Sequence, residues 1–280
     1  MNLNINWYPG HMKKSIDEIK NMLKLSDIVV EICDARIPIS SRNPILKDII
    51  EDRSFILILN KKDLANPKET KKWIEKYKSE NIFAIDIDCK STSDISKVLK
   101  EIDKKGRVQL DKKGLKRDVK AMIVGIPNVG KSSFINALTK KRTAKVGNRP
   151  GITRTNQWIK TEYGLYLLDT PGVLWPKFET EDMGLNLAFT GAIKDEIMDI
   201  ENLAYKFVEF MSKYYMDDLY ERYNLIEKFD EIIQVIEQIA VNRGKVLKGN
   251  RIDYFSVSNL ILDDFRKGNL GRITLEMVEK

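Results

Sequence analysis

The stretch AMIVGIPNVGKSSFINAL, residues 121–138, combines an apolar run, a glycine-rich turn and a helix-like segment. Within it, Gly125 to Ser132 fits the pattern G-x-x-x-x-G-K-[ST]. Loops of this kind wrap their backbone N–H groups around phosphates at the start of a helix, and the glycines allow the close approach. The order strand, loop, helix is the context that the pattern requires. The stretch therefore predicts an α/β fold with a phosphate-binding loop, and the alternative is a chance match in a strand–turn–helix.

The residues of this loop have separate expected roles. Lys131 should reach the β- and γ-phosphates and so act in catalysis, and Ser132 should bind Mg²⁺ through its hydroxyl. The other loop positions expected to contact the nucleotide are Asn128, Val129, Gly130 and Ser133.

A second motif, Asp169-Thr-Pro-Gly172, follows another apolar run. A carboxylate in that position can hold Mg²⁺, and the glycine N–H can bind a γ-phosphate. Between the two motifs, the loop NRPGITRT (148–155) supplies Thr153, whose hydroxyl is the expected second protein ligand to the metal. D-x-x-G alone is a common turn, and Thr153 in an ordinary surface loop is the alternative. The predicted metal site is thus Ser132, Thr153 and Asp169.

A third motif, Asn60-Lys-Lys-Asp63, ends the apolar run of FILILNKKD (55–63). The Asp63 carboxylate can accept hydrogen bonds from guanine N1–H and the 2-amino group. Adenine offers neither donor, so the unpaired carboxylate would cost about 1–3 kcal/mol. Asn60 can bind the base or tie the loop, and the stem of Lys61 can cover the ring face. In isolation the motif is also compatible with a simple turn at the end of a strand.

The segment DCKS (88–91) resembles a degenerate form of the S-A-K loop whose backbone meets the guanine oxygen, with Cys89 and Lys90 as candidates. The base-reading motifs thus precede the phosphate loop in the chain, the reverse of the usual order. A doubly wound sheet can be cut after the Asp169–Gly172 motif and its old termini joined by a linker, because termini commonly lie close together. This predicts a circularly permuted domain.

The pattern of apolar runs predicts the domain organisation. Runs at 27–36, 55–63 and 82–88 alternate with helix-compatible stretches such as 67–79, which indicates βαβ units around a mostly parallel sheet flanked by helices. The Lys-rich segment 103–118 holds two glycines and is interpreted as the linker. We therefore expect the permuted domain to span residues 1–176.

Residues 177–280 have a different pattern and are expected to form a small all-α domain. Their clearest signal is LIEKFDEIIQVIEQIAVNRG (225–244), in which apolar residues recur at helical spacing and Gly244 stands where a helix stop is expected. The connection from Gly172 into this domain would let the nucleotide state set the pose of the domain.

Composition indicates a globular protein of a reducing, cytoplasmic compartment. Charged residues make up 32% of the chain, and the two cysteines form neither a disulfide framework nor a four-ligand zinc site. We expect no membrane association, because the apolar runs are too short to span a bilayer. Residues 1–176 hold 34 Lys+Arg against 21 Asp+Glu, whereas residues 177–280 hold 14 against 20. The basic part favours a polyanion, although a solvated Lys-rich surface is the alternative.

With these motifs in order, the chain resembles the circularly permuted GTPases of the YlqF/RbgA type. The resemblance covers nearly the whole chain and includes WYPGHMKKS (7–15), DARIPISSRNP (34–44) and RPGITR (149–154), besides the three motifs. It implies a GTP-hydrolysing switch that assists assembly of the large ribosomal subunit and binds ribosomal RNA. The net acidic charge of 177–280 departs from a uniformly basic RNA-binding face.

The resemblance implies partners and further candidates. The partners are GTP or GDP and a large-subunit precursor, with no DNA and a monomeric chain. Asn128 resembles the asparagine that holds K⁺ in cation-activated GTPases, and the alternative is an asparagine that only shapes the loop. Val173 stands where many GTPases have a glutamine that orients the attacking water. His11 can take that role, since imidazole orients or deprotonates water near neutral pH, or it can be a bystander.

Two other functions compete with a ribosomal switch. The first is a GTP-regulated RNA-binding protein with a non-ribosomal target and incidental hydrolysis. Basic segments at 104–120, 140–154 and 243–251 suit either RNA partner through phosphate neutralisation. The second is a structural nucleotide-binding subunit, which the intact Lys131 and metal-ligand set disfavour.

Overall fold

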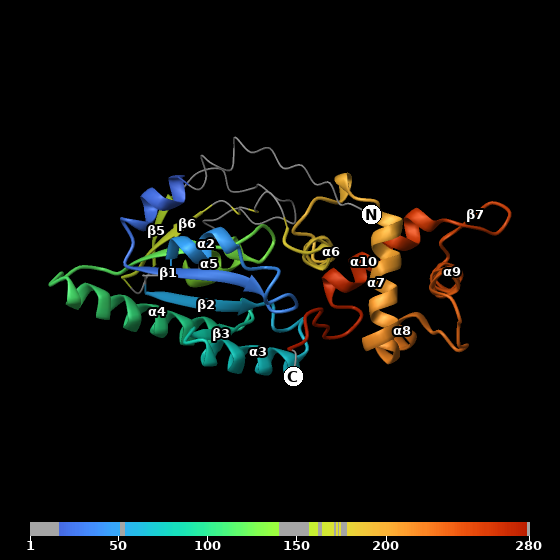
Figure 1. Cartoon of the computed structure of the whole chain (residues 1–280), viewed down its shortest axis with the longest axis horizontal. Helices are drawn as coiled ribbons and strands as arrows, with labels where there is room; N and C mark the ends of the chain where they lie inside the picture. Colours follow the sequence, from blue (N-terminus) through green and yellow to red (C-terminus); the bar gives the residue numbers. More distant parts are fainter. Residues whose placement is uncertain are drawn as a thin grey trace. The chain divides into compact units, whose positions relative to one another are not determined.

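The computed structural model describes residues 17–50, 54–139, 157–161, 164–170, 172, 174 and 178–278, with the backbone alone at 47–49, 157 and 169. By its backbone contacts the chain divides into two compact units. The first combines Met1–Gly184 with Thr274–Lys280, and the second is Leu185–Ile273. Figure 1 labels the helices and strands of both.

The described part of the first unit is built around a six-stranded sheet. In spatial order the strands are β3 (Ala84–Asp86), β2 (Phe55–Asn60), β1 (Ile28–Asp34), β4 (Lys120–Val124), β6 (Tyr166–Asp169) and β5 (Gln157–Lys160). Neighbouring strands are parallel, except that β5 runs antiparallel to β6 at one edge. Every residue of β1 is buried, as expected of a central parallel strand covered on both faces. The mostly parallel sheet that the sequence predicts is confirmed.

Helices cover the sheet of the first unit, and their bounds are α2 (Pro44–Ile50), α3 (Pro67–Ser79), α4 (Thr92–Lys112) and α5 (Lys131–Thr139). Val29 and Cys33, on one face of β1, belong to apolar clusters that include the helical segment 17–23, α2 and α3. Helix α4 lies against β1, β4 and α5. Helix α3 coincides with the predicted helical stretch 67–79, and its first turn is capped by the Asn66 side chain, which accepts from two backbone N–H groups.

The predicted linker at 103–118 is wrong for most of its length, because residues 103–112 continue α4. The buried face of this helix includes Ile102, Gly106 and Leu110, which recur at intervals of one turn. Gly106, one of the two glycines on which the linker prediction rests, lies inside the helix. Its missing side chain makes room for Val119, since a Cβ built at Gly106 would lie 2.2 Å from Val119 Cγ1. The glycine thus serves close packing, and the connection between α4 and β4 is confined to 113–119.

The predicted domain boundary between residues 176 and 177 also differs from the structure. The division falls after Gly184, and helix α6 (Glu181–Phe189) continues across it. The last residues, expected in the helical domain, return to the first unit. There the backbone N–H of Asn66 donates to Thr274 Oγ1 at 3.0 Å, and the Trp73 indole N–H donates to the Glu276 carbonyl at 2.8 Å. Figure 1 accordingly shows the C-terminus beside α3.

The second unit is mainly helical, with α7 (Ile200–Tyr214), α8 (Met216–Tyr223), α9 (Ile232–Asn242), α10 (Tyr254–Lys267) and a 3₁₀ turn at Asp195–Ile197. Its core is aromatic: the Phe207 ring lies 5.3 Å from that of Phe189 and 4.8 Å from that of Phe265, between centroids. The buried Asp264 carboxylate accepts two hydrogen bonds from Arg222 at 3.0 Å and joins α10 to α8. None of the helices in the described parts of the chain is long and apolar enough to cross a membrane.

Two details of the second unit correct the sequence-based expectation. Helix α9 begins at Ile232 rather than at residue 225, and Ile233 of the predicted apolar face is 40% exposed. After the helix, Gly244 adopts a left-handed φ of +65°, which suits its expected role as the helix stop. The unit is also not purely helical, because β7 (Val246–Leu247) and β8 (Arg251–Ile252) form a short antiparallel hairpin that overlaps the basic segment 243–251.

The close approach of α4 to the start of β4 generates a stability prediction. We expect Gly106→Ala to lower the free energy of unfolding by about 1–2 kcal/mol, because overpacking Val119 outweighs the gain in helix propensity. In a Val119→Ala background the approach to the two methyl groups is gone and the closest remaining atom is the Cβ of residue 119 at 3.2 Å, so the same change should cost much less. Denaturant unfolding of the four proteins measures both effects, and an equal cost in both backgrounds would show that the packing at Val119 is not the reason for the glycine.

Candidate nucleotide-binding site

The three predicted motifs meet where the parallel strands end. Asn60 ends β2, Gly125 follows β4 directly, and Asp169 ends β6. Because parallel strands present their carboxyl ends at one edge of a sheet, segments that are far apart in sequence lie together there. The cyclic change of chain order leaves this edge intact.

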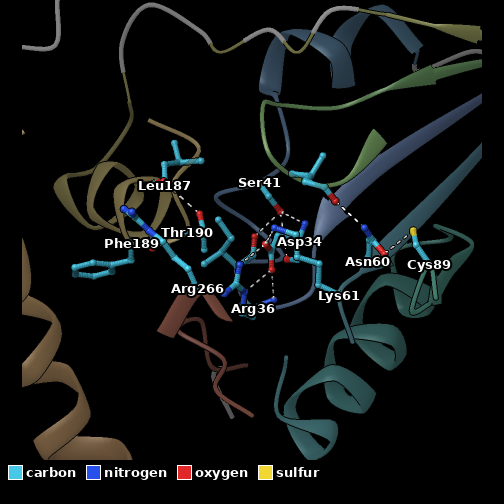
Figure 2. A network of polar contacts seen from close by, with 12 residues as sticks. Asp34, Arg36, Ser41, Asn60, Lys61, Cys89, Leu187, Phe189, Thr190 and Arg266 are labelled. Atoms are coloured by element: carbon cyan, nitrogen blue, oxygen red, sulfur yellow. Dashed lines mark hydrogen bonds and ion pairs between the residues drawn. The ribbon is translucent and has the colours of Figure 1, made fainter. Parts of the chain in front are cut away.

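Asn60 joins the base-reading motif to the phosphate loop. Its side chain is 3% exposed, and Nδ2 donates to the Val129 carbonyl at 2.8 Å. On the other side, its Oδ1 accepts from the Cys89 thiol at 3.1 Å (Figure 2). Burial raises the pKa of the Cys89 thiol to about 12, so the sulfur keeps the proton that it donates. Asn60 therefore ties the loop, one of the two roles expected from the sequence.

The segment 88–91 lies beside the base-reading motif, as its interpretation as a degenerate S-A-K loop requires. Besides the Cys89 contact, the Lys90 ammonium lies 3.0 Å from the Asp63 carboxylate. The Lys90 side chain is 81% exposed, so little free energy is lost when this pair opens to admit a ligand. The backbone N–H of Lys62 also donates to the Ile87 carbonyl at 3.1 Å, which fixes the two loops together.

The phosphate loop has the backbone that its glycines predict. Asn128 has a left-handed φ of +61° and Gly130 a φ of +98°. A Cβ at Gly130 would lie 2.3 Å from Asn60 Nδ2, so only glycine permits the Asn60 bridge. Lys131 is buried, and its ammonium donates to the Ile126 carbonyl at 2.8 Å across the loop. Ser132 and Ser133 follow in the first turn of α5, with half-buried side chains.

The Asp169–Gly172 segment lies against the phosphate loop. Asp169 pairs with Ile123 in the sheet, and the Thr170 hydroxyl donates to the Ile123 carbonyl at 2.8 Å. A Cβ at Gly172 would lie 2.8 Å from Lys131 Nζ and 2.8 Å from the backbone nitrogen of Pro127. The structure thus brings the glycine of the second motif to the lysine of the first, in a space that a larger side chain would fill.

Several predicted residues fall outside this description. His11, Thr153 and Val173 lie outside the described residues, and of Asp169 only the backbone is described. Of the three predicted metal ligands, the structure therefore locates Ser132 at the start of α5 and the backbone of Asp169 at the end of β6. Among the described side chains, no cluster of three or more His, Cys, Asp or Glu residues has the spacing of a metal site.

Asp34 is a part of this edge that the motif analysis did not assign. It ends β1, is 2% exposed, and forms an ion pair with the Lys61 ammonium at 2.9 Å (Figure 2). Arg36 binds the same carboxylate through its guanidinium at 2.8 Å. The signal in the sequence was a charged D-A-R at the end of an apolar run, but nothing local indicates that Lys61 is its partner.

Comparison with known proteins identifies the family of the chain. The family described as "50S ribosome-binding GTPase" matches residues 120–248, and the family described as "RsgA GTPase" matches residues 49–179. The chain is 44% identical to "Ribosome biogenesis GTPase A" of Bacillus cereus, over 99% of this chain and 95% of that one. It is 32% identical to "Mitochondrial ribosome-associated GTPase 1" of Bos taurus, over 96% of this chain and 88% of that one.

Solved structures agree as well. The GDP-bound and GNP-bound structures of YlqF from T. maritima match with TM-scores of 0.66 and 0.65, each at 27% identity and over 94% of this chain. The two matches cover 100% and 98% of the YlqF chains, so the similarity spans both units of this chain. Together, the joined motifs, the full-length relatives and the shared fold show that this chain belongs to the family of circularly permuted ribosome biogenesis GTPases, of the YlqF and ribosome biogenesis GTPase A type.

Proposed function

We propose that the chain hydrolyses GTP as a switch in the assembly of the large ribosomal subunit, and that it binds the precursor subunit or its RNA according to the bound nucleotide. The observation that carries the nucleotide part is the Asn60 side chain, which bridges the phosphate loop and the 88–91 loop at one edge of the sheet. The ribosomal part rests on relatives whose names describe ribosome biogenesis and ribosome association. It implies a cytoplasmic location, where ribosomes assemble.

In this proposal the described residues bind the two ends of GTP. Asp63 selects guanine by accepting hydrogen bonds from N1–H and the 2-amino group. To do so, its carboxylate gives up the ion pair with Lys90. Asn60 and the 88–91 loop hold the base-binding loops in place. Lys131 exchanges its contact with the Ile126 carbonyl for the β- and γ-phosphates, and the N–H of Gly172, which lies near the Lys131 ammonium, binds the γ-phosphate.

The donor set at the phosphate end fits magnesium. Hydroxyl and carboxylate oxygens are the ligands that Mg²⁺ prefers, and Ser132, Thr153 and Asp169 would supply them. A bound Mg²⁺ neutralises charge on the phosphate oxygens. Asn128 is a candidate ligand for K⁺, which would supply positive charge near the same phosphates, and hydrolysis rates compared in potassium and sodium buffers test that role.

An RNA partner is supported by where positive charge is exposed. Lys248 and Arg251 stand exposed on the β7–β8 hairpin, within a segment that has four basic and no acidic residues. The rest of residues 177–280 is net acidic, so contact with RNA phosphates would be confined to such segments. The relatives favour a ribosomal partner over the non-ribosomal RNA target considered from the sequence, and the choice of RNA that stimulates turnover tests this.

The first prediction concerns base choice. Asp63→Asn should weaken GTP binding by roughly tenfold or more and gain binding of xanthosine triphosphate, because the donor and acceptor pattern of the side chain is inverted. Titration of both nucleotides into the two proteins measures this. Asp86→Asn is the matched control, since Asp86 also pairs with a nearby lysine, Lys62 at 3.7 Å, but ends β3 and lies outside the three nucleotide-binding motifs. Unchanged GTP affinity in Asp63→Asn would refute the assignment.

The second prediction concerns the partner. Large-subunit precursors should bind more tightly with a non-hydrolysable GTP analogue than with GDP, because Gly172 senses the γ-phosphate and its segment leads into α6. The same subunits should stimulate turnover, whereas bulk RNA at equal nucleotide concentration should not. Sedimentation binding at one fixed salt concentration and phosphate release measure the two effects. Equal binding in both nucleotide states would rule out the switch, and equal stimulation by bulk RNA would favour the non-ribosomal alternative.

The third prediction concerns the attacking water. Because Val173 cannot hydrogen-bond through its side chain, we propose that His11 orients the water. His11→Ala should then lower single-turnover hydrolysis with large subunits present by roughly a hundredfold, while GTP affinity stays nearly unchanged. Quench-flow measurement of hydrolysis and nucleotide titration separate the two quantities. If hydrolysis in His11→Ala matches that of the parent, His11 is a bystander.

A further inference from the structure

The ammonium of Lys61 is tethered to a buried carboxylate behind the base-binding loop. Lys61 has a left-handed φ of +61°, so the chain turns sharply as β2 ends. Its Nζ lies 2.9 Å from Asp34 Oδ2, and the Asp34 side chain is only 2% exposed. Because both ends of the Lys61 side chain are fixed, its aliphatic stem has few rotamers available.

Asp34 is itself held in one orientation by Arg36. The guanidinium donates to both carboxylate oxygens, from Nε to Oδ1 at 2.9 Å and from Nη2 to Oδ2 at 2.8 Å. The Arg36 backbone N–H adds a third bond to Oδ1 at 3.0 Å. Burial alone would raise the pKa of the Asp34 carboxyl, but the charges of Arg36 and Lys61 outweigh burial and hold that pKa well below its usual range.

The loop that carries Arg36 is in turn hydrogen-bonded to the C-terminal strap, residues 274–278. The Leu275 backbone N–H donates to the Arg36 carbonyl at 2.8 Å. The Glu276 carboxylate accepts from the Ser40 backbone N–H at 2.9 Å, from the Ser40 hydroxyl and from the Ile39 backbone N–H. The support behind Lys61 therefore extends, contact by contact, to the end of the chain.

We propose that Asp34 is a positioning residue for guanine nucleotides, which acts by holding the Lys61 stem where it covers the face of the base. The inference rests on the proposed function, since it needs a base beside Asp63. A lysine that is already tethered loses little freedom when the base arrives, whereas an untethered one must be ordered at that moment. Neutralising Asp34 would also remove the negative charge that Arg36 and Lys61 share, and the repulsion between these two cations would drive Lys61 towards solvent.

The test is a double-mutant cycle on the affinity of the full chain for GDP. Asp34→Asn and Lys61→Ala should each weaken GDP binding roughly tenfold, and the double variant should be at most about twofold weaker than Lys61→Ala alone. Losses that multiply to roughly a hundredfold would overturn the proposal, because Asp34 would then act independently of Lys61. A purely structural Asp34 would lower the melting temperature without this coupling.

Asp27→Asn is the matched control. Asp27 precedes the other end of β1, is 1% exposed, and pairs with Arg117 through two bonds of 2.7 and 2.9 Å. Its neutralisation should lower the melting temperature and leave GDP affinity unchanged. A loss of GDP affinity in Asp27→Asn as large as that in Asp34→Asn would mean that a buried carboxylate at either end of β1 has this effect, and would refute the proposal.

Two further outcomes keep the test decisive. If Asp34→Asn does not fold, Lys61→Ala decides alone. The Lys61 side chain is 23% exposed and its removal leaves the Arg36–Asp34 pair in place, so parental GDP affinity in that variant would refute the role of the stem. Failure of the proposed function is recognised separately, since the parent would then bind GDP no better than ADP and Asp63→Asn would not change base choice. If the protein selects guanine through Asp63 but Asp34→Asn has unchanged GDP affinity, the role of Asp34 is refuted and the proposed function is not.

Discussion

The buried amide of Asn60 is the interaction on which the arrangement of the site depends. An amide offers both donors and an acceptor, and here one donor binds the Val129 carbonyl while the oxygen accepts from Cys89. Few other side chains of this size can satisfy both neighbours, and a buried group left unpaired is costly. The amide also leaves no space for a Cβ at residue 130, so the glycine of the phosphate loop and the asparagine of the base-reading motif constrain each other.

The changed chain order is compatible with this constraint because the contacts are made between strand ends. The parallel sheet places the ends of β2, β4 and β6 at one edge, whichever of them the chain visits first. Between the base-reading loops and β4, the chain runs through α4 and the short 113–119 connection rather than through a long linker. A helix is suited to this connection, since its buried face contributes to the core of the unit.

Charge burial at the end of β1 adds a second constraint. Asp34 serves two cations, Arg36 and Lys61, and its ionised form is favoured in the folded protein because its pKa is depressed. Its contribution to stability is therefore present above the ordinary carboxyl pKa, near 3.9, and is lost as the pH falls towards the folded pKa. The return of residues 274–278 to the Arg36 loop makes the last part of the chain a component of the first unit.

The sequence by itself determined what depends on local pattern. Glycines at 125, 130 and 172, the lysine at 131 and the apolar runs before them predicted the phosphate loop, the strands and the shared edge, because each reflects backbone geometry within a few residues. The order of the motifs predicted the permutation. The stretch 67–79 was predicted as helix-compatible and forms α3 with these bounds, since Asn66 caps the helix and Pro67 suits its first position.

Only the tertiary structure decided what depends on partners distant in the chain. Gly106 is compatible with a helix because Val119 packs against it, which the composition of 103–118 does not reveal. The division between the two units, inside α6, is likewise set by contacts between distant parts of the chain. The contact between Glu276 and Ser40 joins residues that are 236 positions apart. Asp34 meets Lys61 because β1 and β2 are neighbours in register, with Asp34 opposite Asn60. Local sequence carries no information on such pairs, since their energy arises only when burial and charge are brought together by the fold.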